Sequence, residues 1–137
     1  MPDLALVADV PASGASRVVG HILVSRTDLL TDAGDRVAVL MLSPLGVDPA
    51  WQGQGIGSAL VRAALAIADA RPEPVMIVQG HPEYYPRFGF VRGRTVGILP
   101  PEHLGPIDQA WMARPARSGT PAIPGRIVYP QHFVDLD

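Results

Sequence analysis

The chain has no cysteine and no lysine among its 137 residues. Without cysteine, a disulfide framework, a thiolate nucleophile and a cysteine-bound metal are all excluded, and we expect a cytoplasmic protein. Without lysine, no side-chain amine can serve a phosphate-binding P-loop or form a Schiff base. The four histidines are scattered with no pair at ligand spacing, so we expect no metal site.

The sequence also has no large excess of positive or negative charge and no long apolar run. The formal net charge is -2 and the pI is about 6.0, so no basic field points to nucleic acid. No apolar run approaches the length that spans a membrane, and the N-terminus lacks the features of a signal peptide. A hydrophobic content of 47% fits one folded domain over residues 1–137. We therefore expect neither nucleic acid nor a membrane as a partner.

Apolar runs and turn signals predict the first strands. Residues 4–8 and 18–25 read as an antiparallel hairpin around a turn at 11–16. Residues 36–47 form the longest strand candidate. Its side chains are apolar on both faces of the strand, as in a central strand that is covered on both sides. Pro44 interrupts it near its end, so that end should carry backbone groups free of sheet pairing.

A helix is predicted from about Gly55 to about Ala70, because apolar residues recur there at helical spacing and two prolines follow. Residues 75–79 form the next strand, and a strand, a helix and a strand with short links predict a right-handed βαβ unit with parallel strands. The last two strand candidates, 109–113 and 126–129, are expected to pair with each other.

The link between the long strand and the helix is rich in glycine, at positions 53, 55 and 57. Unpaired N–H groups and the dipole at a helix N-terminus favour phosphate. The Walker A pattern is absent, and the alternating glycines do not fit the dinucleotide fingerprint. The glycine spacing alone leaves a purely structural tight turn open.

Two longer motifs resemble those of the GNAT acetyltransferase superfamily. The first, which is similar to the family's acyl-coenzyme A (CoA) motif, is Val47-x-Pro49-x-x-Gln52-x-x-Gly55-x-Gly57. The second, which resembles a short tyrosine-containing helix followed by a Gly-Phe turn, is Tyr85-x-x-Phe88-Gly89-Phe90. Residues 80–90 further resemble a branch of small bacterial predicted N-acetyltransferases, and the resemblance runs from about Leu4 to Phe133.

The resemblance implies the fold class and the cofactor. The fold would be α/β, with a mixed, mainly antiparallel sheet around a central parallel βαβ unit. This sheet would be splayed between the strand ending at Val47 and the strand Val75–Gln79. Loop amides would hold the pyrophosphate of acetyl-CoA, and the end of the long strand would pair with its pantetheine arm. The cofactor-binding residues implied in this way are Leu45, Gly46, Val47, Gln52, Gly53, Gln54, Gly55, Ile56, Gly57 and Ser58.

The resemblance also implies an N-acetyltransferase in which a primary amine of a small molecule or peptide attacks the thioester directly. The backbone N–H of Val47 would polarise the carbonyl. Tyr85 matches the general acid that protonates the leaving thiolate, although it also fits a plain aromatic core residue, and Tyr84 would point elsewhere. The general base is open between His81 and Glu83, which also fit a loop cap or a solvated side chain. The acceptor cannot be read from the sequence.

The chain departs from the family pattern at its N-terminus. The family usually places a strand and two helices before the first hairpin, and these helices wall the acceptor site. Here only Met1, Pro2 and Asp3 precede the hairpin. We therefore expect a second copy of the chain, in a homodimer, or the C-terminal segment to cover the exposed sheet. The departure also keeps an alternative function open, a non-catalytic acyl-CoA-binding module or scaffold.

Overall fold

The computed structural model describes residues 4–12, 15–102, 109–115 and 123–128, and every structural statement below concerns these residues. The larger elements are β1 (Leu4–Ala12), β2 (Ala15–Thr31), β3 (Arg36–Val47), α1 (Ile56–Asp69), β4 (Val75–Gln79), β7 (Trp111–Pro115) and β8 (Gly125–Val128). The shorter ones are the strands β5 (Val91–Arg92) and β6 (Ile98–Leu99) and the 3-10 helices η1 (Pro49–Trp51), η2 (Tyr85–Phe88) and η3 (Gly93–Val96).

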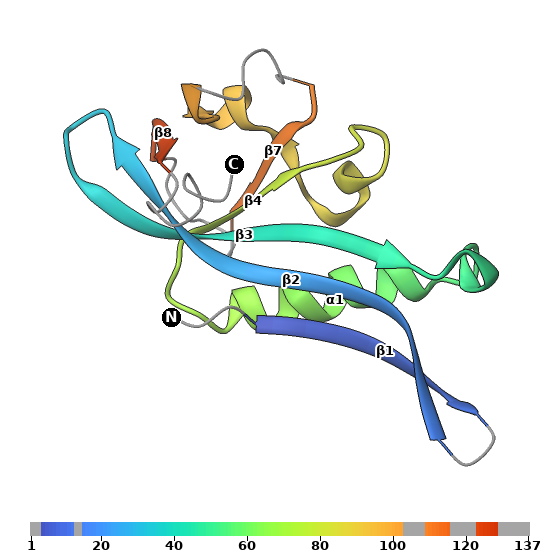
Figure 1. The fold of residues 1–137 in the computed structure, drawn as a ribbon. Coiled ribbons are helices and arrows are strands. Elements are labelled where there is room, and N and C mark those ends of the chain that lie inside the picture. The colour runs from blue at the N-terminus through green and yellow to red at the C-terminus, as the bar shows by residue number, and fades with distance from the viewer. Residues whose placement is uncertain (1–3, 13–14, 103–108, 116–122, 129–137) are drawn as a thin grey trace.

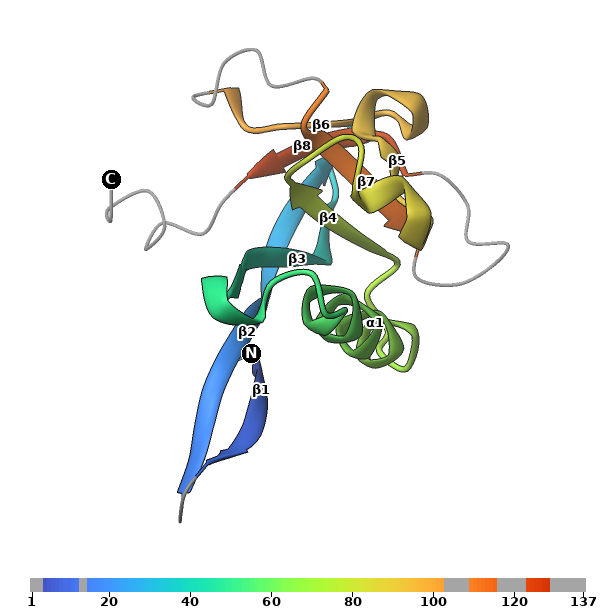
Figure 2. The ribbon, with the colours of Figure 1, turned by 90° about the vertical axis from the view of Figure 1, so that its right-hand side faces the viewer.

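The strands form one mixed sheet, in the order β5-β7-β4-β3-β2-β8-β6, with β1 also paired to β2. The β1–β2 and β2–β3 pairs are antiparallel, whereas β3 and β4 run parallel on either side of α1 in the chain. Figure 1 shows α1 along the long strands, and Figure 2 shows it end-on beside the sheet. The predicted fold class, a mainly antiparallel sheet around a parallel βαβ unit, is confirmed.

The first hairpin is longer than predicted. Its strands continue through the expected turn at 11–16, because Pro11 pairs with Ser16 and Ala12 pairs with Ala15. A proline is tolerated there because, among the described strands, β1 pairs with β2 alone. The other edge of β1 therefore needs no backbone N–H donor. Strand β2 also continues to Thr31, since its last residues pair with both β3 and β8.

The expectation that the last two strands pair with each other is wrong. Strand β7 pairs antiparallel with β4, from Val75↔Pro115 to Gln79↔Trp111, and β8 pairs antiparallel with the end of β2. The two strands therefore fill opposite sides of the sheet. Each one satisfies backbone groups that a long neighbouring strand would otherwise leave without partners, and a hairpin between β7 and β8 would leave both sites open.

Apolar side chains pack on both faces of the sheet. On one face, α1 buries Leu60, Val61, Ala64, Leu65 and Ala68 against β2, β3 and β4. On the other face, Trp111 packs in a second cluster with Val39 and Ile127, and its indole N–H donates to the carbonyl of Ile98 at 3.2 Å. None of the helices in the described part of the chain is long and apolar enough to cross a membrane.

Glu73 is a buried carboxylate between α1 and β4, with 4% of the residue exposed. Arg71 donates to both of its oxygens, at 2.8 and 3.0 Å. Burial raises the pKa of Glu73, but the hydrogen bonds from Arg71 and from backbone outweigh it and hold the pKa below the ordinary value of 4.5. The ion pair therefore stabilises the fold above about pH 4.5, and this stabilisation is lost as the pH falls through the depressed pKa.

Glu73→Gln is expected to lower the free energy of unfolding by about 1–3 kcal/mol at pH 7, because Arg71 loses its charged partner. The difference from wild type should shrink as the pH falls below about 4. Urea denaturation of both proteins at pH 7 and at low pH measures this, with the exposed Glu83→Gln as the control. Equal stability of wild type and Glu73→Gln at pH 7 would contradict the assignment.

Candidate functional site

Strands β3 and β4 separate at one end of the sheet. Their pairing runs from Leu40↔Met76 to Leu42↔Val78 and goes no further, although β3 continues to Val47. The register of β2 against β3 also shifts between Ile22 and Val24, next to Pro44. Figure 1 shows the two strands diverging toward their carboxyl ends. The end of β3 therefore has one edge without a neighbouring strand, as its proline and glycine predicted.

The segment that follows β3 is anchored at its start. The backbone N–H of Asp48 donates to the carbonyl of Val19 at 2.6 Å, and the carboxylate of Asp48 accepts from the N–H of Ala50 at 2.9 Å. The side chain of Gln52 donates to the carbonyl of Val47 at 3.1 Å. These bonds fix the glycine loop relative to the free end of β3.

Two glycines give the loop its shape. Gly53 has a φ of 80° and Gly55 a φ of 83°, in the left-handed region that other residues rarely adopt. Gly55 is the N-cap of α1, and it provides no side chain to cap the helix. No acidic residue lies in the first turn of α1. The N–H groups at this helix end therefore remain available for an anion.

A cavity of about 230 Å³ lies beside this helix end. It is lined by Val47, Trp51, Gln52, Gly53, Gly55, Ile56, Gly57, Ser58 and Tyr84. Most of the residues that the sequence predicted for the cofactor are thus brought together at one cavity. Gln54 is exposed and does not line it, and Gly46 lies on β3 outside it. The sequence reasoning missed Trp51 and Tyr84.

Tyr84 faces the glycine loop. Its hydroxyl lies 3.2 Å from the Oγ of Ser58 in the first turn of α1, so Tyr84 points in a different direction from the buried Tyr85 and toward the cofactor cavity. Its ring packs edge-on against Tyr85 and Phe88, at centroid distances of 5.1 and 5.3 Å. The short 3-10 helix η2 turns these neighbouring aromatic side chains in different directions, which adjacency in the sequence alone did not specify.

Tyr85 has its ring in the core, with 6% of the residue exposed. The ring packs against Gly80, where a Cβ would collide with it, and edge-on against Phe90 at 5.6 Å. Burial, and then the neighbouring Tyr84, raise the pKa of the Tyr85 hydroxyl. A phenol is already protonated at neutral pH with its ordinary pKa, and a raised pKa makes it a weaker acid, so the shift does not favour the acid role. The geometry accommodates both the acid role and a plain core role, and the acid role stays a prediction.

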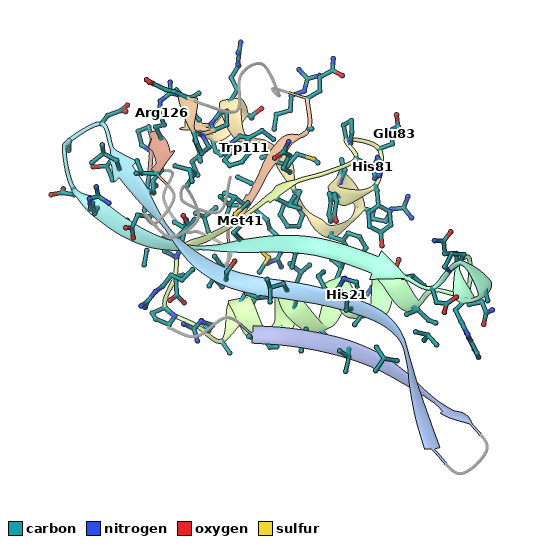
Figure 3. All side chains as sticks on the ribbon, viewed as in Figure 1. His21, Met41, His81, Glu83, Trp111 and Arg126 are labelled. Carbon is teal, nitrogen blue, oxygen red and sulfur yellow. The ribbon has the colours of Figure 1, made fainter. Side chains whose placement is uncertain are left out.

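His81 and Glu83 are exposed on the loop that follows β4. Figure 3 shows both on this loop, with Glu83 directed outward. The backbone carbonyl of His81 accepts from the N–H of Tyr84 at 3.1 Å, but neither His81 nor Glu83 lines the cavity beside the glycine loop. Their role as a base stays a prediction. Among the described residues, no group of three or more His, Cys, Asp and Glu could hold a metal ion.

Two arginines lie over the aromatic side chains next to the cavity. The guanidinium of Arg87 lies 4.7 Å from the ring centre of Tyr84 and donates to its carbonyl at 3.0 Å. The guanidinium of Arg62 lies 5.6 Å from the ring centre of Phe88, one helical turn beyond Ser58. Together with the helix end, these cations make the neighbourhood favourable for an anionic ligand.

Arg114 on β7 holds η2 against α1. It donates to the carboxylate of Asp69 at 3.0 and 3.3 Å and to the carbonyl of Phe88 at 3.0 Å. The end of α1 and the end of η2 are thus joined through one side chain. This contact therefore fixes the position of α1 relative to η2, at whose start Tyr84 and Tyr85 lie.

Comparison with known proteins identifies the class of this chain. The acetyltransferase (GNAT) domain family matches residues 5–92, which include the glycine loop, both tyrosines and the splayed strands. The chain therefore belongs to the GNAT acetyltransferase family. The resemblance inferred from the two sequence motifs is confirmed.

Individual relatives agree with this assignment. The uncharacterized N-acetyltransferase YjhQ of Escherichia coli (strain K12) is 40% identical over 76 residues, which are 54% of this chain and 40% of YjhQ. YhbS from Escherichia coli in complex with CoA superposes with a TM-score of 0.74 at 23% identity, over 85% of this chain and 63% of YhbS. A Brucella melitensis GNAT acetyltransferase in complex with acetyl-CoA gives 0.63 at 26%, over 85% and 62%. The chain thus spans less than two thirds of each of these proteins.

Proposed function

We propose that this protein is an acetyl-CoA-dependent N-acetyltransferase, which transfers the acetyl group to a primary amine by direct attack. The observation that carries the proposal is the cavity at the uncapped N-terminus of α1, beside the free end of β3. The chain belongs to a family of acetyltransferases, and two structures of similar fold were solved with CoA and acetyl-CoA.

The cofactor follows from the geometry of the loop. The amides of residues 52–58 would hold the pyrophosphate at the helix end. The pantetheine arm would lie along β3 from Leu45 to Val47, where β4 has left the sheet edge open. This path brings the thioester into the splay between the strands, where the N–H of Val47 would polarise its carbonyl.

The transfer uses one deprotonated amine and one proton donor. The amine nitrogen attacks the thioester carbonyl, the carbon–sulfur bond breaks, and the leaving thiolate takes a proton from the hydroxyl of Tyr85. The hydroxyl of Tyr85 is protonated at neutral pH, so it has a proton to give when the thiolate forms. His81 or Glu83 would relay the proton of the amine through water.

The second candidate function is a module that binds acyl-CoA without transferring the acyl group. The burial of the Tyr85 ring in the core favours it. Release of free thiol from acetyl-CoA in the presence of a panel of primary amines separates the two. Release that depends on an amine supports the enzyme, and binding without release supports the module. No binding of acetyl-CoA would contradict both.

Arg62→Ala and Arg87→Ala are each expected to weaken CoA binding by about threefold to tenfold, since each removes an exposed cation next to the phosphate site. The loss should diminish at higher salt, because salt screens exposed charges. Calorimetric titration of CoA at low and at high NaCl concentration measures both effects. Arg36→Ala is the control, because Arg36 pairs with Asp28 where β2 meets β3, far along the sheet. Unchanged affinity in both variants would contradict the proposed phosphate site.

Other partners are not assigned by these observations. A structure of similar fold, at a TM-score of 0.61 and 20% identity, is the KacTA–DNA complex, so the exclusion of nucleic acid stays a prediction. The expected homodimer, or cover by the C-terminal segment, also stays a prediction, since residues 129–137 lie outside the described part of the chain.

A further inference from the structure

A second cavity, of about 260 Å³, lies on the other side of the same strand end. His21, Asp48 and Val18 line it. It shares Val47 with the cavity beside the glycine loop. Acyl transfer requires donor and acceptor to meet, and the shared Val47 places the two cavities next to each other.

His21 enters this second cavity from the face of the sheet opposite α1. A Cβ on the preceding residue, Gly20, would lie 3.1 Å from side-chain atoms of Ile56 and Leu60, so Gly20 faces α1. Side chains alternate along a strand, so His21 points to the other face. Figure 3 shows His21 on β2 alongside β3.

The imidazole of His21 lies over the backbone of Gly46, its partner on β3. A Cβ on Gly46 would lie 2.5 Å from Cε1 of the imidazole and 3.2 Å from each ring nitrogen. The absence of a side chain at Gly46 thus lets the ring extend across β3, toward the edge that β4 leaves open. Within the described residues, the imidazole of His21 has no ion-pair partner.

The lining of this cavity indicates its ligand. Asp48 contributes a carboxylate to the lining of this cavity, and a carboxylate attracts a cation such as an ammonium group. Val18 is 56% exposed and provides an apolar wall, and Val7, the cross-strand partner of His21 on β1, is 55% exposed. A small alkylammonium ion combines this charge with a matching apolar chain.

We propose that the second cavity binds the acceptor, a small primary alkylamine, and that His21, in place of His81 or Glu83, is the base that deprotonates it. The inference rests on the proposed acetyl transfer. The ammonium group gives one proton to a ring nitrogen of His21, and the free amine attacks the thioester carbonyl at Val47. The carbon–sulfur bond breaks, and the thiolate takes a proton from the hydroxyl of Tyr85. The nitrogen loses its second proton as the amide forms, and this proton restores Tyr85, while His21 returns its own proton to solvent. Donor and acceptor thus approach from opposite faces of the sheet.

Binding of a joined substrate tests the location. The probe is CoA whose sulfur is linked through a CH2–C(=O) group to the nitrogen of n-butylamine. We expect wild type to bind this probe at least about tenfold tighter than CoA, because linkage makes the second contact intramolecular. Val18→Trp should abolish the gain by filling the cavity, whereas Val91→Trp, on the distant β5, should keep it. No gain in wild type, or a full gain in Val18→Trp, overturns the inference. Failure of CoA itself to bind would contradict the proposed function instead.

Turnover of n-butylamine tests the role of His21. At saturating acetyl-CoA, His21→Gln should lower kcat/KM for the amine by about a hundredfold, the usual size of a general-base contribution. The affinity for CoA should stay within twofold of wild type, since His21 does not line the cofactor cavity. Equal turnover by His21→Gln, or no N-butylacetamide formed by wild type, overturns the assignment.

Discussion

Tyr85→Phe is expected to lower kcat for acetyl transfer by about a hundredfold or more, while the affinity for CoA stays within twofold of wild type. The variant removes the phenolic proton and keeps the ring that packs against Gly80 and Phe90. The thiolate must then leave without a proton, which raises the barrier of the step in which the carbon–sulfur bond breaks. Steady-state thiol release and calorimetric titration of CoA give the two quantities.

Tyr84→Phe is the matched control, because the two tyrosines are neighbours with different surroundings. The hydroxyl of Tyr84 contacts Ser58 at the cofactor cavity, so its loss should weaken CoA binding a few-fold and leave kcat largely intact. The reverse pattern, with kcat lost in Tyr84→Phe and kept in Tyr85→Phe, would contradict the assignment of the acid. Loss of folding in Tyr85→Phe is not expected, because a buried phenylalanine fills nearly the same volume.

Gly55→Val is expected to weaken CoA binding by at least about tenfold. Gly55 has a φ of 83° at the N-cap of α1, and a left-handed conformation costs other residues about 1–2 kcal/mol, most of all a β-branched one. The substitution therefore forces the loop to change shape and turns the helix N–H groups away from the phosphate. Calorimetric titration of CoA measures the loss of affinity.

Gly34→Val separates the loss of the phosphate site from backbone strain in general. Gly34 has a φ of 95° in the turn between β2 and β3, and a Cβ added at Gly34 or at Gly55 would meet no atom within 4 Å. Both variants should therefore lower the melting temperature by a similar amount, and only Gly55→Val should lose affinity for CoA. Wild-type affinity in Gly55→Val would contradict the placement of the pyrophosphate.

Much of the region around the site could be predicted from the sequence. Strand β3 ends at Val47 and β4 spans Val75–Gln79, as predicted, because apolar runs bounded by prolines and glycines leave little freedom. Helix α1 begins one residue after Gly55 for the same reason. These elements depend on local signals, and the family motifs lie on them.

Features that depend on tertiary contacts could not be predicted. The partners of β7 and β8 depend on which sheet edges remain open after the long strands pair, and no local pattern encodes this. Helical spacing predicts Ala63 on the buried stripe of α1, but Ala63 is exposed and Val61 is buried, because the helix's rotation is set by the sheet below it. The inward direction of Tyr84 follows from the 3-10 geometry of η2 and from Ser58, which is distant in the sequence.

A crystal structure of the protein with bound acetyl-CoA tests the central claim most directly. We expect the pyrophosphate within hydrogen-bonding distance of the amides of residues 52–58, and the thioester carbonyl at the N–H of Val47. The pantetheine arm should lie along the end of β3 that has no β4 partner. Acetyl-CoA bound elsewhere, with the N-terminus of α1 left empty, would contradict it.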